Sequence, residues 1–207
     1  MARSGLALRR GVLGVVALIS GGLLLGCGTS LDTVAKSTGI PHSLLLQARP
    51  IGSGASFRPP ATGPVTGGCR HRLGPRSGVH VELFADNRVV IVAAGIGTRP
   101  PRSHLLGRIS RAACYGTVVT LEPTGVVLVR AGSRPLLSDL FRAWGQPLSP
   151  RRLASFASTG MPVAVFVDGR RWHGLPGNVP LTAHSEIVLE IGPHVPPHTS
   201  YAFPPGT

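Results

Sequence analysis

The chain has 207 residues, 43% of them hydrophobic, which suffices for one folded domain with appended segments but excludes a large multidomain enzyme. Glycine (28) and proline (20) are abundant, so we expect many turns between short strands and little helix. The formal charge is +13, yet the arginines are scattered and aromatic residues make up only 5%. Because nucleic-acid binders gather their charge on one stripe with interleaved aromatics, we expect no nucleic-acid partner.

Residues 1–26 have the pattern of a secretory signal peptide. Three arginines precede an apolar run over 11–25, which is shorter than the about 20 residues of a membrane-spanning helix. The run ends in Leu24-Leu25-Gly26-Cys27, which resembles the lipobox of bacterial lipoproteins. The resemblance implies cleavage before Cys27, a lipid such as palmitate on that cysteine, and a location on the extracytoplasmic face of the cell membrane. An uncleaved signal anchor is the alternative interpretation.

The three cysteines support the same location. If lipidation consumes Cys27, an even pair remains in an oxidising compartment, and we predict a disulfide between Cys69 and Cys114. Such a bond closes a loop of about 45 residues and typically contributes about 2–4 kcal/mol to stability. Two separate buried thiols are the alternative.

The mature chain is expected to begin with a lipid-anchored tether and a linker over residues 27–78. Twelve of the 29 residues from 50 to 78 are glycine or proline, a composition that predicts a flexible segment. We expect a globular β-rich domain over 79–192 and a free, proline-rich tail over 193–207.

Short apolar runs separated by turn residues predict most of the strands. In chain order these are 80–84, 89–92, 116–121, 126–129, 162–167, 170–172 and 187–191. Asp86-Asn87 and Asp168-Gly169 are turn candidates, because Asp, Asn and Gly tolerate the left-handed backbone that a tight hairpin requires.

One helix is predicted between the second and third strand pairs. Ser133 is its expected cap, Pro135 suits its first turn, and Gly145 ends it after apolar residues at helical spacing. Residues 147–156 are expected to form a weaker helical turn that exposes Arg151 and Arg152.

These elements predict an α+β, mostly β domain in which a small mixed sheet packs on one helix. Their order is that of a β-grasp, and residues 165–191 are similar to the end of ubiquitin-like sulfur carriers. Those carriers end in Gly-Gly, whereas this chain continues to Thr207, so carrier function is not expected. Another small mixed β-fold with the same strand content is the alternative.

Several short sequence segments, in their order and spacing, resemble a known protein family. They are His80, residues 92–97, Cys114, Gly125, and residues 137–145, 167–169, 181–191 and 201–204. Together they resemble an uncharacterised family of exported or membrane-anchored bacterial proteins that carries a His-Thr-His-Asp motif. At the place of that motif this chain has Val119-Thr120-Leu121-Glu122. The resemblance therefore implies a degenerate metal site, since the two histidines that could share an ion on one strand face are apolar here.

Among the remaining histidines, His80 and His198 are the candidate ligands for a copper or zinc ion. The alternative for His80 is simply the first residue of a half-buried strand, since strand-borne histidines are more often solvated or hydrogen-bonded.

The sequence contains no catalytic constellation, so we expect no enzyme activity and no required cofactor. It predicts a lipid-anchored binding module for an unknown envelope protein or other envelope component. The expected contact residues are Phe166, Arg170, Arg171 and Trp172 of the last hairpin, which is expected to be exposed and apolar. A metal-binding or metal-delivery envelope protein is the alternative function.

Overall fold

The computed structural model describes residues 49–207; the expected signal peptide and Cys27 lie outside them. The helical elements are the 3-10 turn η1 (Ala55–Phe57), the α-helix α2 (Leu137–Trp144) and the 3-10 turn η2 (Pro176–Asn178). The strands are β1 (Arg76–Ala85), β2 (Arg88–Val90), β3 (Thr98–Leu105), β4 (Arg108–Tyr115), β5 (Val118–Val119), β6 (Val126–Arg130), β7 (Leu148–Ser149), β8 (Arg152–Leu153), β9 (Phe156–Ala157), β10 (Ala164–Val167), β11 (Arg170–Arg171) and β12 (Glu186–Ile191).

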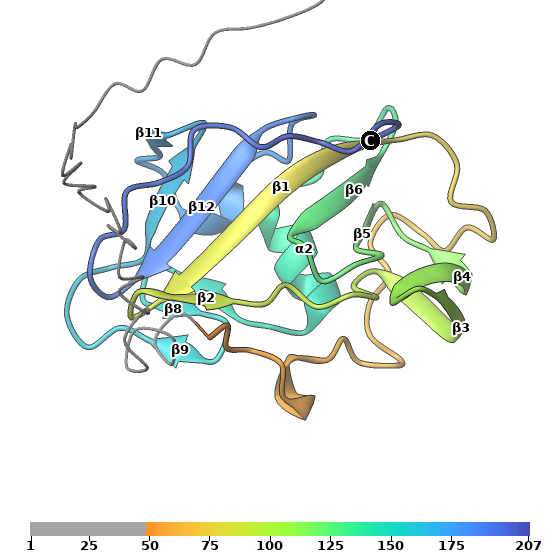
Figure 1. The fold of residues 1–207 in the computed structure, drawn as a ribbon, viewed down its shortest axis with the longest axis horizontal. Coiled ribbons are helices and arrows are strands. Elements are labelled where there is room, and N and C mark those ends of the chain that lie inside the picture. Colours follow the sequence, from red (N-terminus) through yellow and green to blue (C-terminus); the bar gives the residue numbers. More distant parts are fainter. Residues whose placement is uncertain (1–48) are drawn as a thin grey trace, which may run out of the picture. The chain divides into compact units, whose positions relative to one another are not determined.

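The main sheet has the order β11-β10-β12-β1-β6-β5, and β2 also pairs with β1. Its two central strands, β1 and β12, are parallel, and all other pairings are antiparallel. Helix α2 lies behind this sheet in Figure 1. The domain is therefore α+β and mostly β, with a β-grasp-like mixed sheet around one helix, as the element order predicts.

Strand alternation decides which face of the sheet is the core. Val79, Val81 and Leu83 of β1 are buried on the side of α2, where they meet the apolar stripe of the helix. That stripe includes the fully buried Phe141 and Trp144. The intervening residues of β1 point to the opposite face, because side chains alternate along a strand.

Strands β3 and β4 form a separate two-stranded hairpin inserted between β2 and β5. It packs its Ile109 and Tyr115 on a second, smaller apolar cluster with Val119 and Leu128. A disulfide joins Cys69 to Cys114 of β4, with 5.4 Å between the Cα atoms, so this part of the prediction is confirmed. The bond fastens the segment before β1 to the hairpin.

The segment 50–78, predicted as a flexible linker, instead packs along the domain. Phe57 is buried, and its carbonyl oxygen accepts a hydrogen bond of 2.6 Å from the indole N–H of Trp144. Ile51 pairs with Val90, and the sheet already begins at Arg76. High glycine and proline content permits an irregular path, but these tertiary contacts hold that path in place.

Residues 147–156 were predicted as a helical turn and instead lie in the small sheet β7-β8-β9. Pro147 and Pro150 cannot donate the backbone hydrogen bonds of a helix, and Ala154 has a positive φ of 51°, which ends any helical run. Arg151 and Arg152 are exposed as expected. Further on, residues 193–207 return over the outer face of the sheet rather than forming a free tail (Figure 1).

Candidate functional site

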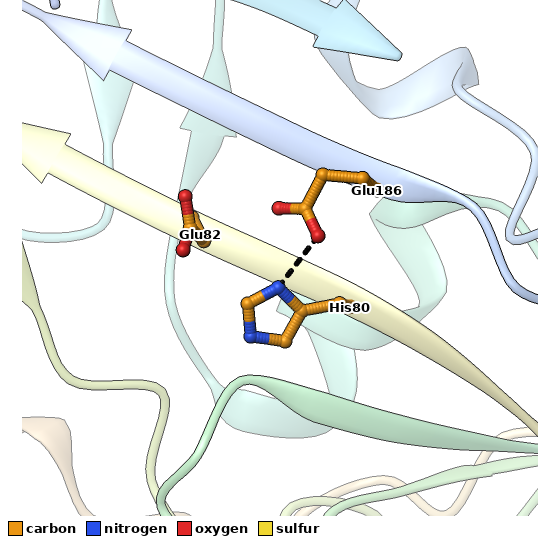
Figure 2. Close-up of side chains that lie close together, drawn as sticks. All are labelled: His80, Glu82 and Glu186. Carbon is orange, nitrogen blue, oxygen red and sulfur yellow. Dashed lines mark hydrogen bonds and ion pairs between the residues drawn. The ribbon is translucent and has the colours of Figure 1, made fainter. Parts of the chain in front are cut away.

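The candidate site lies on the face of the sheet opposite α2. His80 and Glu82 occupy alternate positions of β1 and therefore share this face. Glu186 of β12 stands directly opposite His80 in the parallel register. Figure 2 shows the three side chains gathered over the two central strands, with the carboxylate of Glu186 directed at the imidazole.

Both ring nitrogens of His80 face oxygen atoms. Nε2 lies 3.0 Å from the carbonyl oxygen of Thr124, which only accepts, so Nε2–H donates this bond. Nδ1 lies 2.7 Å from Oε2 of Glu186. Two lone pairs facing each other at that distance repel, so a proton lies between Nδ1 and Oε2. A metal ion that replaces this proton requires the two atoms to move apart, because its bonds to them are about 2.0–2.1 Å long.

Glu186 is 1% exposed, yet its second carboxylate oxygen has no hydrogen-bond partner among the described residues. A buried carboxylate oxygen without a hydrogen bond is costly, so the site favours a cation or a proton beside it. One ligand atom each from His80, Glu82 and Glu186 lies within 4.8 Å of the others. Ligand atoms around a zinc ion lie about 3.4 Å apart when the bonds are about 2.0–2.1 Å, so these three atoms must shift relative to one another to bind one ion.

The C-terminal segment covers this cluster. The ring of Tyr201 stacks on the His80 imidazole, with 3.7 Å between centroids and 12° between planes. His198 Nδ1 lies 2.7 Å from Oε2 of Glu82, and this hydrogen bond together with the carboxylate charge raises the pKa of His198. The site is therefore built from β1, β12 and the end of the chain.

A second histidine–carboxylate pair continues the same face. His194 Nδ1 lies 2.8 Å from Oε2 of Glu190, a residue of β12 that is 2% exposed and whose Oε1 has no partner among the described residues. Three of the eight acidic residues of this basic chain, Glu82, Glu186 and Glu190, thus lie on one face of the sheet and each meets a histidine.

Gly125 makes room for the imidazole of His80. Its φ is +82°, and a Cβ at this position would lie 2.7 Å from the Val81 carbonyl oxygen and 2.9 Å from Nε2 of His80. Only glycine fits this combination of backbone conformation and close approach. The turn before β6 is therefore shaped around the histidine.

A cavity of about 480 Å³ opens beside the cluster, and Thr124 and Tyr201 form part of its wall. Its charged side chains are already engaged. The Arg76 guanidinium donates to the carbonyl oxygens of Leu73, Thr117, Leu128 and Gly116, and burial lowers the pKa of Arg76 to about 10. Arg108 pairs with Glu122 at 2.9 Å. The cavity therefore offers no free charge to a ligand.

The structure places the predicted metal ligands close to one another but not as a pair. His80 is in the cluster, whereas His198 contacts it through Glu82. The sequence analysis did not identify Glu82 or Glu186 as candidate ligands. The alternation His80-x-Glu82 was a visible signal, but the parallel pairing that brings Glu186 opposite His80 was not.

The predicted partner-binding hairpin β10–β11 presents mainly its arginines. Arg170 and Arg171 are exposed, whereas Phe166 is 7% exposed and lies under the Arg171 guanidinium, 5.7 Å from the ring centroid. Trp172 is half-buried and donates its indole N–H to the carbonyl oxygen of Leu175 at 3.2 Å. The apolar surface expected there is largely covered, and partner capture through this hairpin stays a prediction.

Fold and site together define an α+β domain with a covered histidine–carboxylate cluster at the centre of its sheet. No protein-family model, curated protein or solved structure matches the chain. The resemblance to an exported family with a His-Thr-His-Asp motif therefore stays a prediction. No helix among residues 49–207 is long and apolar enough to cross a membrane.

Proposed function

We propose that the protein is a non-catalytic binding domain whose ligand is a divalent metal ion held by His80, Glu82 and Glu186. One observation carries the proposal: the buried Glu186 carboxylate faces the His80 imidazole at 2.7 Å and keeps an unpartnered oxygen beside it. A cation bound there satisfies both the imidazole lone pair and the orphaned oxygen.

The donor set favours zinc. One imidazole and two carboxylates are ligands that zinc accepts in proteins, and the set contains no sulfur donor of the kind that selects Cu(I). The hydrogen bond from Nε2–H of His80 to Thr124 supports this assignment, because a metal-bound histidine usually donates its other ring N–H to a carbonyl or carboxylate.

A binding role is favoured over a catalytic one by the cover on the site. Catalytic zinc sites keep one position open to water or substrate. Here Tyr201 stacks on His80, and His198 occupies one oxygen of Glu82, so the exposed side of the cluster is closed by the chain itself.

The proposal includes attachment to the extracytoplasmic face of the membrane through a lipid on Cys27. Its support is the sequence of residues 1–27, with basic residues, a short apolar run and the Leu-Leu-Gly-Cys ending. The disulfide fits this location, because disulfides persist in oxidising compartments. Denaturing mass analysis of the protein extracted from membranes tests the anchor, since an acylated Cys27 adds the mass of its fatty acids.

Zinc binding is measured by calorimetric titration of the detergent-solubilised full chain with zinc chloride. We expect one zinc ion per chain, and a loss of at least about tenfold in affinity for Glu186→Gln, which removes the negative charge but keeps the shape. Glu122→Gln is the matched control, because Glu122 is paired with Arg108 outside the cluster. Unaltered zinc binding by Glu186→Gln, or none by the unmodified chain, would exclude this function.

A further inference from the structure

A second feature of the molecule lies at the tip of the β3–β4 hairpin, in the two-residue turn Leu106-Gly107. Both turn residues have positive φ, 50° and 79°. The main sheet contains two turns of the same kind, Asp86-Asn87 (49° and 62°) and Asp168-Gly169 (50° and 74°). Both of those turns have Asp at the first position, which suits the left-handed region, whereas the hairpin tip has a bulky leucine there.

Packing does not account for this leucine. Leu106 is 99% exposed and its neighbour Leu105 is 65% exposed. The hairpin buries other residues, Ile109 and Tyr115, in the second apolar cluster. The tip thus combines backbone strain with complete exposure of an apolar side chain, and neither cost is offset by a contact among the described residues.

The hairpin is also uniformly basic. Residues 98–115 contain four arginines, Arg99, Arg102, Arg108 and Arg111, and no Asp or Glu. Arg99 and Arg111 are exposed on its two strands, as is His104 beside the tip. Arg108 and Arg111 of β4 lie nearest the two exposed leucines, and Arg108 is also paired with Glu122. Arg99 lies at the base of the hairpin, opposite Cys114.

We propose that this tip inserts into the interface of a membrane that contains anionic lipids. In this arrangement Leu105 and Leu106 enter the boundary between headgroups and acyl chains, and the exposed arginines bind lipid phosphates. Interfacial binding of this kind depends on buried apolar area together with attraction to anionic lipids. Two leucines offer far less surface than the about 800 Å² that each partner contributes to a stable protein–protein interface, so the observations favour a lipid surface.

This contact is separate from the metal site and from the lipid expected on Cys27. A membrane contact at the tip adds to the anchor and fixes the orientation of the domain relative to the membrane. Neither the zinc titration nor the mass of the lipid measures contact between the hairpin tip and the membrane. Failure of the tip proposal is therefore distinguishable from failure of the metal site or of the lipid anchor.

The test uses the full chain reconstituted in vesicles of phosphatidylcholine with phosphatidylglycerol, in which the acyl chains carry bromine as a fluorescence quencher. Leu106→Trp places a reporter at the tip, and Met161→Trp is the control, because Met161 is 64% exposed on a different loop. We expect brominated lipid to quench the added fluorescence of L106W and not that of M161W, and the quenching to be lost in pure phosphatidylcholine. Equal quenching of both reporters, or quenching of neither, would overturn the proposal; the second result points to a protein partner for the tip.

A second variant separates insertion from folding. Leu106→Asp installs the residue that the other two turns use, so the hairpin should fold at least as well. We expect anionic vesicles to protect the amide hydrogens of 103–111 from exchange in the unmodified chain, and this protection to be lost in L106D. Unchanged protection in L106D would show that the leucine has no part in membrane contact.

Discussion

Two residues decide the geometry around His80. Gly125 leaves the space that the imidazole fills, and the Thr124 carbonyl oxygen orients the ring by accepting the Nε2–H bond. The second nitrogen is thereby directed at Glu186. Neither effect depends on the hydrophobic pattern of the strand, which only determines that His80 points away from the core.

Replacing Gly125 by alanine should therefore damage the site as well as the fold. We expect Gly125→Ala to lower the free energy of unfolding by about 2–4 kcal/mol, because its Cβ collides with the Val81 carbonyl oxygen and the His80 ring. Chemical denaturation followed by the fluorescence of the buried Trp144 measures this change.

Gly132→Ala is the control for Gly125→Ala. Gly132 has a similar φ of +75°, but no atom lies within 4 Å of the added Cβ. Only the backbone strain of about 1–2 kcal/mol applies there. Equal losses in the two variants would show that the close approach at Gly125 is unimportant.

Helix α2 illustrates how an element's ends depend on more than composition. Ser133, the predicted cap, donates its hydroxyl to the Arg130 carbonyl oxygen at 2.5 Å and lies before the helix. The actual cap is Leu136, whose N–H donates to the Asp139 carboxylate at 2.9 Å, while Gly145 ends the helix at a φ of 73° as predicted. The helix begins later than predicted because the Asp139 carboxylate accepts a hydrogen bond from the backbone three residues earlier. This bond is one half of a capping box, whose usual Ser or Thr is absent here.

Asp139→Ala should destabilise the domain by about 0.5–2 kcal/mol, the usual cost of losing an N-terminal cap. The change also removes the 2.6 Å contact with Arg142, which is exposed and adds little. Ser138→Ala, one position earlier, should change the stability by less than about 0.5 kcal/mol. If thermal unfolding shows the two variants to be equally stable, Asp139 does not cap the helix.

At the scale of the whole molecule, the two ends of the described chain hold the domain together. The segment before β1 reaches the core through Phe57 and is fastened by the disulfide. The C-terminal segment lies across the outer face of the sheet, where Tyr201 stacks on His80 and His184 Nε2 meets the Thr207 carbonyl oxygen at 2.7 Å. A sheet with polar residues on its outer face thereby becomes covered on both sides.

Tyr201→Ala should loosen this cover. We expect a loss of about 1–3 kcal/mol in the free energy of unfolding, since stacked aromatic pairs contribute about 0.5–1.5 kcal/mol beyond their buried area. The proton resonances of the His80 ring should also move downfield as the ring current of Tyr201 disappears. Tyr201→Phe keeps the ring and should preserve both properties; a His80 spectrum unaffected by Tyr201→Ala would argue against the stacking.

Local pattern by itself determined much of the fold. Alternating apolar residues and left-handed turn residues predicted the strands of the main sheet and its tight turns, and the single helix was predicted from apolar spacing and Gly145. Cysteine number predicted the disulfide between Cys69 and Cys114, which is confirmed. These features depend on residues that are close in sequence or on an even number of available cysteines. They could therefore be predicted without a structure.

Only the tertiary structure decided the rest. The pairing of β1 with β12 joins residues more than a hundred positions apart and places Glu186 opposite His80. The irregular segments 50–78 and 193–207 carry no periodicity, so composition made them appear free, whereas Phe57 and Tyr201 hold them in place. Burial of Glu186 and the cover over His80 are consequences of this long-range packing, and they alone turn three scattered residues into a candidate site.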